Sequence, residues 1–235
     1  MKTKQIKKAV AAAFPCTIPV LTGYLFMGIA FGILLQSQGF GAIWAFLMAL
    51  LVYAGSGQFV AAGFMGAGFN PVVALALTLM VNARHIFYGI SMLDKFKNFG
   101  KVKWYMVFSL TDETFSLLVS AKHQPEVPRK HFWVAIAALN QFYWVAGCLL
   151  GGLLGQALPI NTKGIEFVMT ALFVVILLEQ WKSKANRVPA LLGLSASAVC
   201  RVLFGPQWFI LAAMAVLIVV FALARKPIER SVKPE

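Results

Sequence analysis

Residues 41–67 read GAIWAFLMALLVYAGSGQFVAAGFMGA and contain no Asp, Glu, Lys, Arg or His. They lie within a longer run of 75 residues, Ala9 to Ala83, that also lacks these five residue types. One helical crossing of a bilayer needs about 20 consecutive apolar residues. The run is therefore long enough for several crossings, and the sequence predicts an all-α integral membrane protein.

The centre of this stretch is poorly suited to a continuous helix. Gly55 and Gly57 flank Ser56, and each glycine weakens a helix by about 1 kcal/mol relative to alanine. Irregular backbone at membrane depth is tolerated only where protein buries it or where it lines a wet cavity. We therefore predict a broken or re-entrant helix at Gly55–Gly57.

A break at this point would also create a binding site. A half-helix that starts after Gly57 would direct free backbone N–H groups and the positive end of its dipole toward an anion. Ser56 and Gln58 would add hydrogen-bonding side chains to this substrate site. The alternative is that these small residues only allow helices to pack closely.

The composition supports a single integral membrane domain over residues 1–235. Hydrophobic residues make up 60% of the chain and charged residues 12%, against about a quarter charged in soluble domains. The net charge of +13 is concentrated in short clusters beside apolar spans, where it would set orientation and contact the lipid bilayer. These clusters include a cytoplasmic N-terminus at 1–16 and a C-terminal tail at 226–235.

Several classes of partner are not supported by the sequence. No basic face with interleaved aromatic residues is present, so we expect no nucleic acid partner. The three cysteines are isolated and lack metal-ligand spacing, so we expect no metal site and no cofactor. They are Cys16, Cys148 and Cys200.

The apolar spans predict six to eight transmembrane helices. They lie near 17–36, 41–67, 72–93, 104–121, 132–158, 165–181, 189–204 and 207–225. The N-terminal lysines and the cluster Lys95–Lys103 both favour the cytoplasm, yet three ordinary crossings would place them on opposite sides. One of the first three spans must therefore fail to cross, and the second is the best candidate.

A similar conflict between Lys103 and Lys182 indicates a second irregular span. The glycines between Gly147 and Gly155 make the fifth span the candidate. Two irregular spans fit the inverted repeats of transporters, whose broken helices meet near the midplane. No repeat is visible at the level of residues, so the inverted repeat is a hypothesis.

The third span contains the sequence Asn82-Ala83-Arg84-His85-Ile86-Phe87-Tyr88. A cation at membrane depth normally faces the protein interior and marks a site. The Arg84 guanidinium can bind a substrate carboxylate through two hydrogen bonds, and His85 titrates near neutral pH and can relay a proton. Asn82 and Tyr88 share helix faces with these two residues and are candidate structural groups. The alternative is that Arg84 forms a structural ion pair.

The fourth span contains two adjacent carboxylates, Asp112 and Glu113, which would point about 100° apart on a regular helix. Buried carboxylates in membrane spans mark ion pathways. We expect these two to bind a substrate ammonium group and to take up the coupled proton. A structural ion pair with Arg84 is the alternative. Asn140 and Gln141 in the fifth span are weaker candidates for hydrogen bonds between helices.

Four motifs in this order resemble the AzlC family, the large subunit of branched-chain amino-acid exporters. They are Pro19-x3-Gly23 with Ala30-Phe31-Gly32, then Tyr53-Ala54-Gly55-Ser56-Gly57-Gln58-Phe59, then Asn82-Ala83-Arg84-His85 with Tyr88-Gly89 and Ser91, and Thr111-Asp112-Glu113-Thr114-Phe115. The resemblance covers about the first 120 residues and does not itself supply functional residues.

The resemblance implies a multi-pass protein of the bacterial cytoplasmic membrane. It further implies proton-driven export of neutral, hydrophobic amino acids, such as valine, leucine or isoleucine, together with a small AzlD-type membrane subunit. Two alternatives remain at this point. One is a passive channel or scaffold subunit, and the other is an intramembrane hydrolase with Ser56 as nucleophile and His85 as base.

Overall fold

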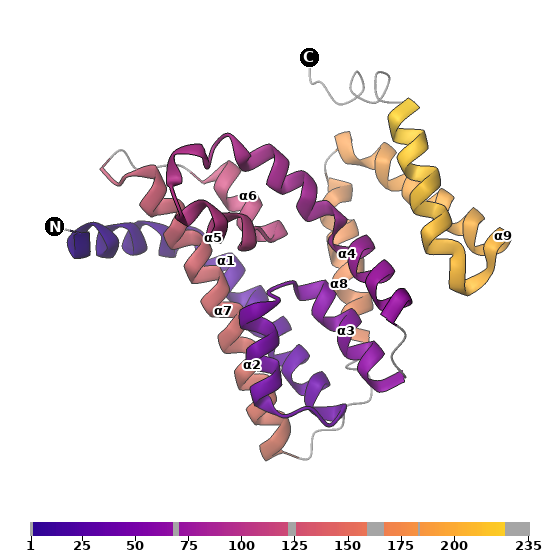
Figure 1. Ribbon diagram of the computed structural model, residues 1–235, viewed down its shortest axis with the longest axis horizontal. Coiled ribbons are helices and arrows are strands. Elements are labelled where there is room, and N and C mark those ends of the chain that lie inside the picture. Colours follow the sequence, from indigo (N-terminus) through magenta and orange to yellow (C-terminus); the bar gives the residue numbers. More distant parts are fainter. Residues whose placement is uncertain (1, 68–70, 122–125, 159–166, 183, 224–235) are drawn as a thin grey trace. The chain divides into compact units, whose positions relative to one another are not determined.

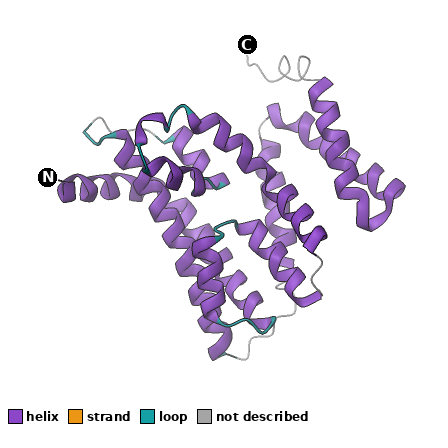
Figure 2. Ribbon diagram, in the orientation of Figure 1, coloured by secondary structure: helices purple, strands orange, loops and turns teal. Residues whose placement is uncertain are grey.

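The computed structural model describes residues 2–67, 71–121, 126–158, 167–182 and 184–223, and all regular elements within these ranges are helical (Figures 1 and 2). In chain order they are α1 (Lys2–Ser37), α2 (Ala42–Leu51), α3 (Gly55–Ala67), α4 (Pro71–Leu93), the 3-10 helix η1 (Lys97–Phe99), α5 (Val102–Phe108), α6 (Asp112–Ser120), α7 (Arg129–Ala157), α8 (Phe167–Lys182) and α9 (Lys184–Leu223). The all-α prediction is therefore confirmed for the described residues.

The chain divides into two compact units, Met1–Val168 and Met169–Glu235. Within the described ranges, three helical segments are long and apolar enough to cross a membrane, namely Gln5–Ser37, Arg129–Ala157 and Arg187–Gly205. Two of them belong to the first unit and form its framework.

Helices α1 and α7 run parallel and in very close contact. Thr17 hydrogen-bonds the Tyr143 hydroxyl at 3.0 Å near the start of the contact, and Gln36 lies against Gly155 near its end. Between them, a Cβ atom added at Gly32 would collide with backbone atoms of α7. Small residues permit such close approach of two apolar helices.

One expectation about these helices is wrong. The glycines from Gly147 to Gly155 do not break the fifth span, because α7 is continuous across them and uses them to pack against α1. Within the N-terminal segment 1–16, the described residues are helical from Lys2 onward and belong to α1.

The second apolar span is broken, as predicted, and folds back on itself as a hairpin of α2 and α3. Helix α2 starts with Ala42 against Gly152 near the end of α7, and its Leu50 carbonyl accepts a hydrogen bond from Gln141, close to the middle of α7. Helix α3 starts at that middle level and returns, because Phe59 packs edge-to-face on Phe31 at 5.4 Å. The break lies at 52–54, so α3 starts at Gly55 and not after Gly57.

The fourth apolar span is a second helical hairpin, made of α5 and α6, and the expectation of a regular helix there is wrong. The hydroxyl of Tyr105 on α5 donates to Gln141 at 2.9 Å, so α5 approaches the middle of α7. The chain turns at 109–111, and α6 then leads back toward the start of α7, where Leu118 shares a core with Phe132. The turn places Asp112 at the first position of α6.

The two hairpins approach the middle of α7 from opposite ends (Figure 1). Tyr53 at the tip of the α2–α3 hairpin packs against Phe108 at the tip of the α5–α6 hairpin, with ring centroids 6.1 Å apart. Helix α4 passes beside both hairpins. A Cβ atom at Gly57 would lie 2.9 Å from the Asn82 amide nitrogen, and Tyr88 stacks on Phe115 at 4.5 Å.

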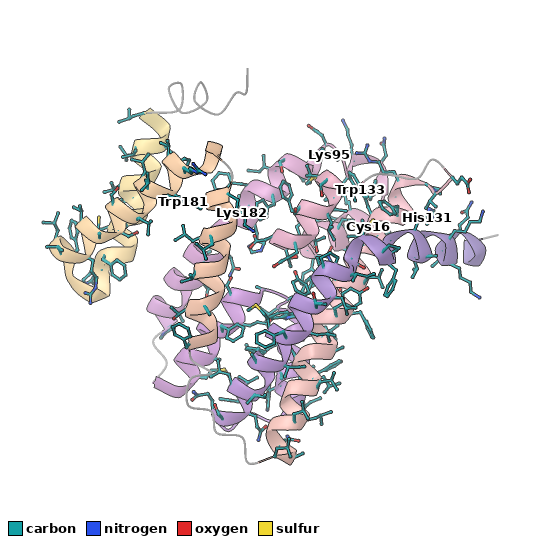
Figure 3. All side chains as sticks on the ribbon, turned by 180° about the vertical axis from the view of Figure 1, so that it is seen from behind. Cys16, Lys95, His131, Trp133, Trp181 and Lys182 are labelled. Atoms are coloured by element: carbon teal, nitrogen blue, oxygen red, sulfur yellow. The ribbon has the colours of Figure 1, made fainter. Side chains whose placement is uncertain are left out.

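Three clusters of basic residues lie at one end of the first unit. Phe96, Phe99 and Trp133 form an aromatic core at this end together with Ala9 and Ala13 of α1. Figure 3 shows Lys95, Trp133 and His131 in this region. The basic residues beside this core are Lys7, Lys8, Lys95, Lys97, Lys101, Lys103, Arg129 and Lys130. We call this the basic end.

At the opposite end Gly41 lies near Gln156. These two residues belong to the stretches 9–83 and 131–162, which contain no Lys or Arg. We call this end the uncharged end. Helices α1 and α7 run from the basic end to the uncharged end.

The second unit contains α9 and most of α8. Helix α9 is interrupted at Gly205, whose φ of 71° and ψ of −179° are not helical. The boundary between the two last predicted spans, 189–204 and 207–225, therefore coincides with a break in the backbone.

Candidate functional site

The Tyr24 hydroxyl lies at the centre of a polar cluster between the two hairpins. It hydrogen-bonds Thr111 Oγ1 at 2.6 Å and donates to the Glu113 carboxylate at 2.7 Å. Thr111 is the N-cap of α6, and its side chain accepts from the backbone N–H of Thr114 at 3.2 Å. The cluster therefore ties the middle of α1 to the first turn of α6.

Trp144 connects this cluster to the first turn of α3. Its ring packs edge-to-face on the Tyr24 ring at 5.4 Å, and its indole N–H donates to Gln58 Oε1 at 2.8 Å. A Cβ atom at Gly55 would lie 3.3 Å from the same indole ring, so the start of α3 is pressed against Trp144. Both half-helices thus begin at one Tyr24–Trp144 pair.

The predicted residues of the Gly55–Gln58 stretch fall inside this cluster. Gln58 is fully buried and Ser56 is buried. Gly57 allows the side chain of Asn82 to approach the backbone of α3. Because α3 begins at Gly55, its first turn contains the N–H groups that no helical carbonyl can accept from. A buried helix start with this composition can hold an anionic group.

The two carboxylates predicted from the sequence lie at the start of a helix and not within a regular span. Asp112 and Glu113 occupy the first turn of α6. There a carboxylate is favoured by the positive end of the helix dipole. The Glu113 carboxylate accepts a hydrogen bond from the Tyr24 hydroxyl, which ties Glu113 directly to the cluster.

Asn140 and Gln141, the weaker candidates, are joined to both hairpins by α7. The Asn140 amide donates to Thr114 Oγ1 at 3.0 Å. Gln141 accepts from Tyr105 and donates to the Leu50 carbonyl. Gln141 therefore satisfies an end carbonyl of α2, which is a structural role, whereas Asn140 belongs to the polar cluster.

The predicted residues of the third span lie on α4 beside the cluster. Asn82 donates to the Thr78 carbonyl at 3.0 Å and approaches Gly57. His85 Nδ1 lies 3.2 Å from the Asn82 carbonyl oxygen, and its ring packs edge-to-face on Tyr88. The backbone of Arg84 lies in α4 between these contacts. Its side chain is outside the described part, so the Arg84–Asp112 pairing stays a prediction.

Several polar atoms of the cluster are buried and have no hydrogen-bond partner among the described residues. They are the Tyr53 hydroxyl, Gln58 Nε2, Asn82 Oδ1 and Asn140 Oδ1. Buried polar groups in native proteins are nearly always paired, with protein, water or a ligand. Their concentration at the hairpin starts identifies this cluster as the candidate site. No group of residues suited to a metal ion occurs within the described ranges.

Sequence reasoning missed Tyr24, Trp144 and Tyr53 as members of the site. Tyr24 and Trp144 lie within apolar spans, where an aromatic ring is read as packing. Each of these side chains carries a polar O–H or N–H group, and a buried Tyr or Trp usually hydrogen-bonds through that group. This was the one sequence feature that could have indicated their role.

Replacing Trp144 with Phe is expected to lower stability by about 1–3 kcal/mol, because it leaves the buried Gln58 Oε1 without its donor. Thermal unfolding of the purified protein would measure the loss. Combining it with Gln58→Leu removes both partners, so the double variant is expected to recover part of the stability. If the stability loss of the double variant equals the sum of the losses of the two single variants, this hydrogen bond does not link α3 to α7.

Residues 19–158 match the family model described as AzlC protein, a range that contains both hairpins and the whole cluster. The chain is 47% identical over 230 residues to the branched-chain amino acid transport protein AzlC of Bacillus subtilis, covering 98% of this chain and 91% of that protein. The chain belongs to the AzlC family.

More distant members of the comparison agree with a membrane protein. An uncharacterized membrane protein of Haemophilus influenzae is 44% identical over 207 residues, covering 88% of this chain and 85% of that protein. The inner membrane protein YgaZ of Escherichia coli is 25% identical over 179 residues, covering 72% of each chain. No solved structure matches this member of the AzlC family.

Proposed function

We propose that this AzlC-family chain is a secondary transporter that exports branched-chain and other hydrophobic amino acids across the cytoplasmic membrane. The observation that carries the proposal is the meeting of two half-helix starts, Gly55 of α3 and Thr111 of α6, around the buried Tyr24–Trp144 pair. Broken helices whose ends meet in the protein interior are the usual binding architecture of secondary transporters. The name of the Bacillus subtilis relative supports the same substrate class.

The cluster offers complementary groups for both ends of a zwitterion. The positive end of the α3 dipole, with the Gln58 side-chain amide, suits the α-carboxylate. The carboxylates of Glu113 and Asp112 suit the α-ammonium group. The rings of Phe31 and Phe59, next to Gln58, supply apolar surface for the substrate side chain. In this proposal Arg84 is a second carboxylate ligand.

The basic clusters support one orientation in the membrane. Positive loops favour the cytoplasm, and three such clusters lie at the basic end of the first unit. If α1, α4, α7, α8 and the two halves of α9 each cross once and both hairpins are re-entrant, Lys182–Arg187 and the tail 226–235 also face the cytoplasm. This arrangement of six crossings removes the conflicts that the simple span count produced.

Labelling of single cysteines is expected to distinguish the two ends. In a cysteine-free background, Ser37→Cys at the uncharged end should react with a membrane-impermeant maleimide in intact cells. Lys97→Cys at the basic end should react only in inside-out vesicles. Labelling of both positions from the same side would contradict the re-entrant α2–α3 hairpin.

Export is proposed to be coupled to protons through Asp112, Glu113 and His85. A carboxylate that binds the substrate ammonium in one step and a proton in the next can exchange the two across the membrane. A small AzlD-type subunit is the proposed partner, required for export or for assembly.

The experiment that tests this function is transport of radiolabelled leucine into proteoliposomes with and without an imposed proton gradient. We expect gradient-driven accumulation that protonophore abolishes, in liposomes containing the chain and its small partner. Leucine flux that only equilibrates, and that is unaffected by the gradient, would indicate a passive channel instead. A Ser56→Ala variant that retains transport would dismiss the hydrolase alternative.

A further inference from the structure

Tyr53 at the tip of the α2–α3 hairpin has an unusual backbone conformation. Its φ is 45°, and it is the only non-glycine residue in the described part of the chain with a positive φ. A bulky side chain rarely adopts this left-handed region. Such conformations persist where surrounding structure enforces them, and they cluster at ligand clamps and switch regions.

The side chain of Tyr53 is buried without satisfying its hydroxyl. Tyr53 is 4% exposed, and its hydroxyl lies near the side chains of Thr114 and Tyr24 but makes no hydrogen bond of good geometry within the described residues. The ring is held against Phe108 of the opposite hairpin. The packing therefore fixes where the hydroxyl points, while the hydroxyl itself still needs an acceptor.

A second unpaired donor lies on the same hairpin. Gln58 Nε2 is buried without a partner among the described residues, although Gln58 Oε1 is held by Trp144. Gln58 is in the first turn of α3, where the positive end of the helix dipole also favours an anion. Two side-chain donors and a helix start on one hairpin match an anionic group with several acceptor oxygens.

We propose that the Tyr53 hydroxyl is a substrate-binding group, which donates a hydrogen bond to the α-carboxylate of the transported amino acid. The inference rests on the proposed function and adds a ligand that neither the family match nor the sequence motifs assign. Gln58 Nε2 is the second side-chain donor to the same carboxylate. In this arrangement the bound substrate connects Tyr53, at the tip of the α2–α3 hairpin, to the first turn of α3.

The test compares leucine with leucinamide, which keeps the ammonium group but lacks the carboxylate. Binding of each to the purified protein is measured by competition with radiolabelled leucine. Tyr53→Phe is expected to weaken leucine binding about 10- to 100-fold, the effect of one hydrogen bond to a charged group. Leucinamide, whose neutral amide oxygen accepts a weaker hydrogen bond, is expected to be weakened less, by about 2- to 10-fold.

The matched control is Tyr105→Phe, which also removes one phenolic hydroxyl. The Tyr105 hydroxyl already donates a hydrogen bond to Gln141 and is not proposed to contact the substrate. Its effect on leucine and leucinamide should be equal. Equal weakening of both ligands by Tyr53→Phe, or no weakening of either, would overturn the inference.

A second measurement does not depend on a variant that folds. With 3-fluorotyrosine incorporated, the ¹⁹F resonance of residue 53 should shift further on addition of leucine than on addition of leucinamide. Identical responses to both ligands would overturn the role of Tyr53. Failure of the wild type to bind any hydrophobic amino acid would instead overturn the proposed function, so the two failures are distinguishable.

Discussion

Glu113→Gln is expected to lower leucine transport about 10- to 100-fold while leaving the amount of folded protein unchanged. Glu113 starts α6 and accepts a hydrogen bond from Tyr24 at 2.7 Å, so glutamine can occupy the same position and still accept that bond. What the variant loses is the negative charge. A hydrogen bond between charged groups is worth about 1.5–3 kcal/mol, which corresponds to this range of affinity.

The control for Glu113→Gln is Asp94→Asn, which removes one negative charge from an exposed position after α4. Transport by this variant should stay within about twofold of the wild type, since exposed charges contribute little. Initial rates in proteoliposomes, normalised to protein, provide the measurement. Wild-type rates for Glu113→Gln would remove Glu113 from the mechanism.

Gly32→Ala is expected to prevent the protein from accumulating in a folded form. The added methyl group would collide with the Cys148 carbonyl oxygen and with backbone atoms of Gly151 and Gly152. Backbone atoms inside two packed helices cannot move aside as a flexible side chain can. Overpacking in an interior costs typically about 1–3 kcal/mol and occasionally more, and this contact should exceed that range because backbone meets backbone.

Gly23→Ala on the same helix is the matched control, because nothing lies within 4 Å of a Cβ atom added there. Alanine is favoured over glycine in helices by about 1 kcal/mol, so this variant should accumulate at least as well as the wild type. Size-exclusion chromatography of fluorescent fusions in detergent compares the two. A monodisperse peak of normal height for Gly32→Ala would contradict the close α1–α7 contact.

The sequence was most informative where chemistry conflicts with a continuous apolar helix. The lack of charge from Ala9 to Ala83 predicted membrane helices, and Gly55 and Gly57 predicted the broken second span. The positive clusters independently required that one early span fail to cross. These signals agree because each reports a property that a lipid environment penalises strongly, namely exposed backbone or misplaced charge.

The second hairpin could not be found in the same way. Its turn at 109–111 contains Ser109, Leu110 and Thr111, which carry no glycine or proline signal. Thr111 followed by two acids is a good N-cap sequence, but within an apolar span it reads equally as a polar helix face. The glycines of α7 misled for the opposite reason, since close packing and breakage use the same residue.

The partners of the site depend on tertiary contacts that no local pattern encodes. Tyr24 and Thr111 are 87 positions apart in the chain and meet only because α1 passes beside the start of α6. Gln58 and Trp144 are 86 positions apart. The polar residue types were visible in the sequence, but their assembly around one pair of aromatic side chains required the fold.

The most direct test of ammonium recognition by Glu113 uses 4-methylpentanoate, which is leucine without its ammonium group. We expect the wild type to bind leucine at least about 10-fold more tightly than this analogue. Glu113→Gln should abolish this preference for leucine, whereas Asp94→Asn should keep it. Competition against radiolabelled leucine on the purified protein measures all three ratios. An undiminished preference in Glu113→Gln would show that Glu113 does not recognise the substrate ammonium.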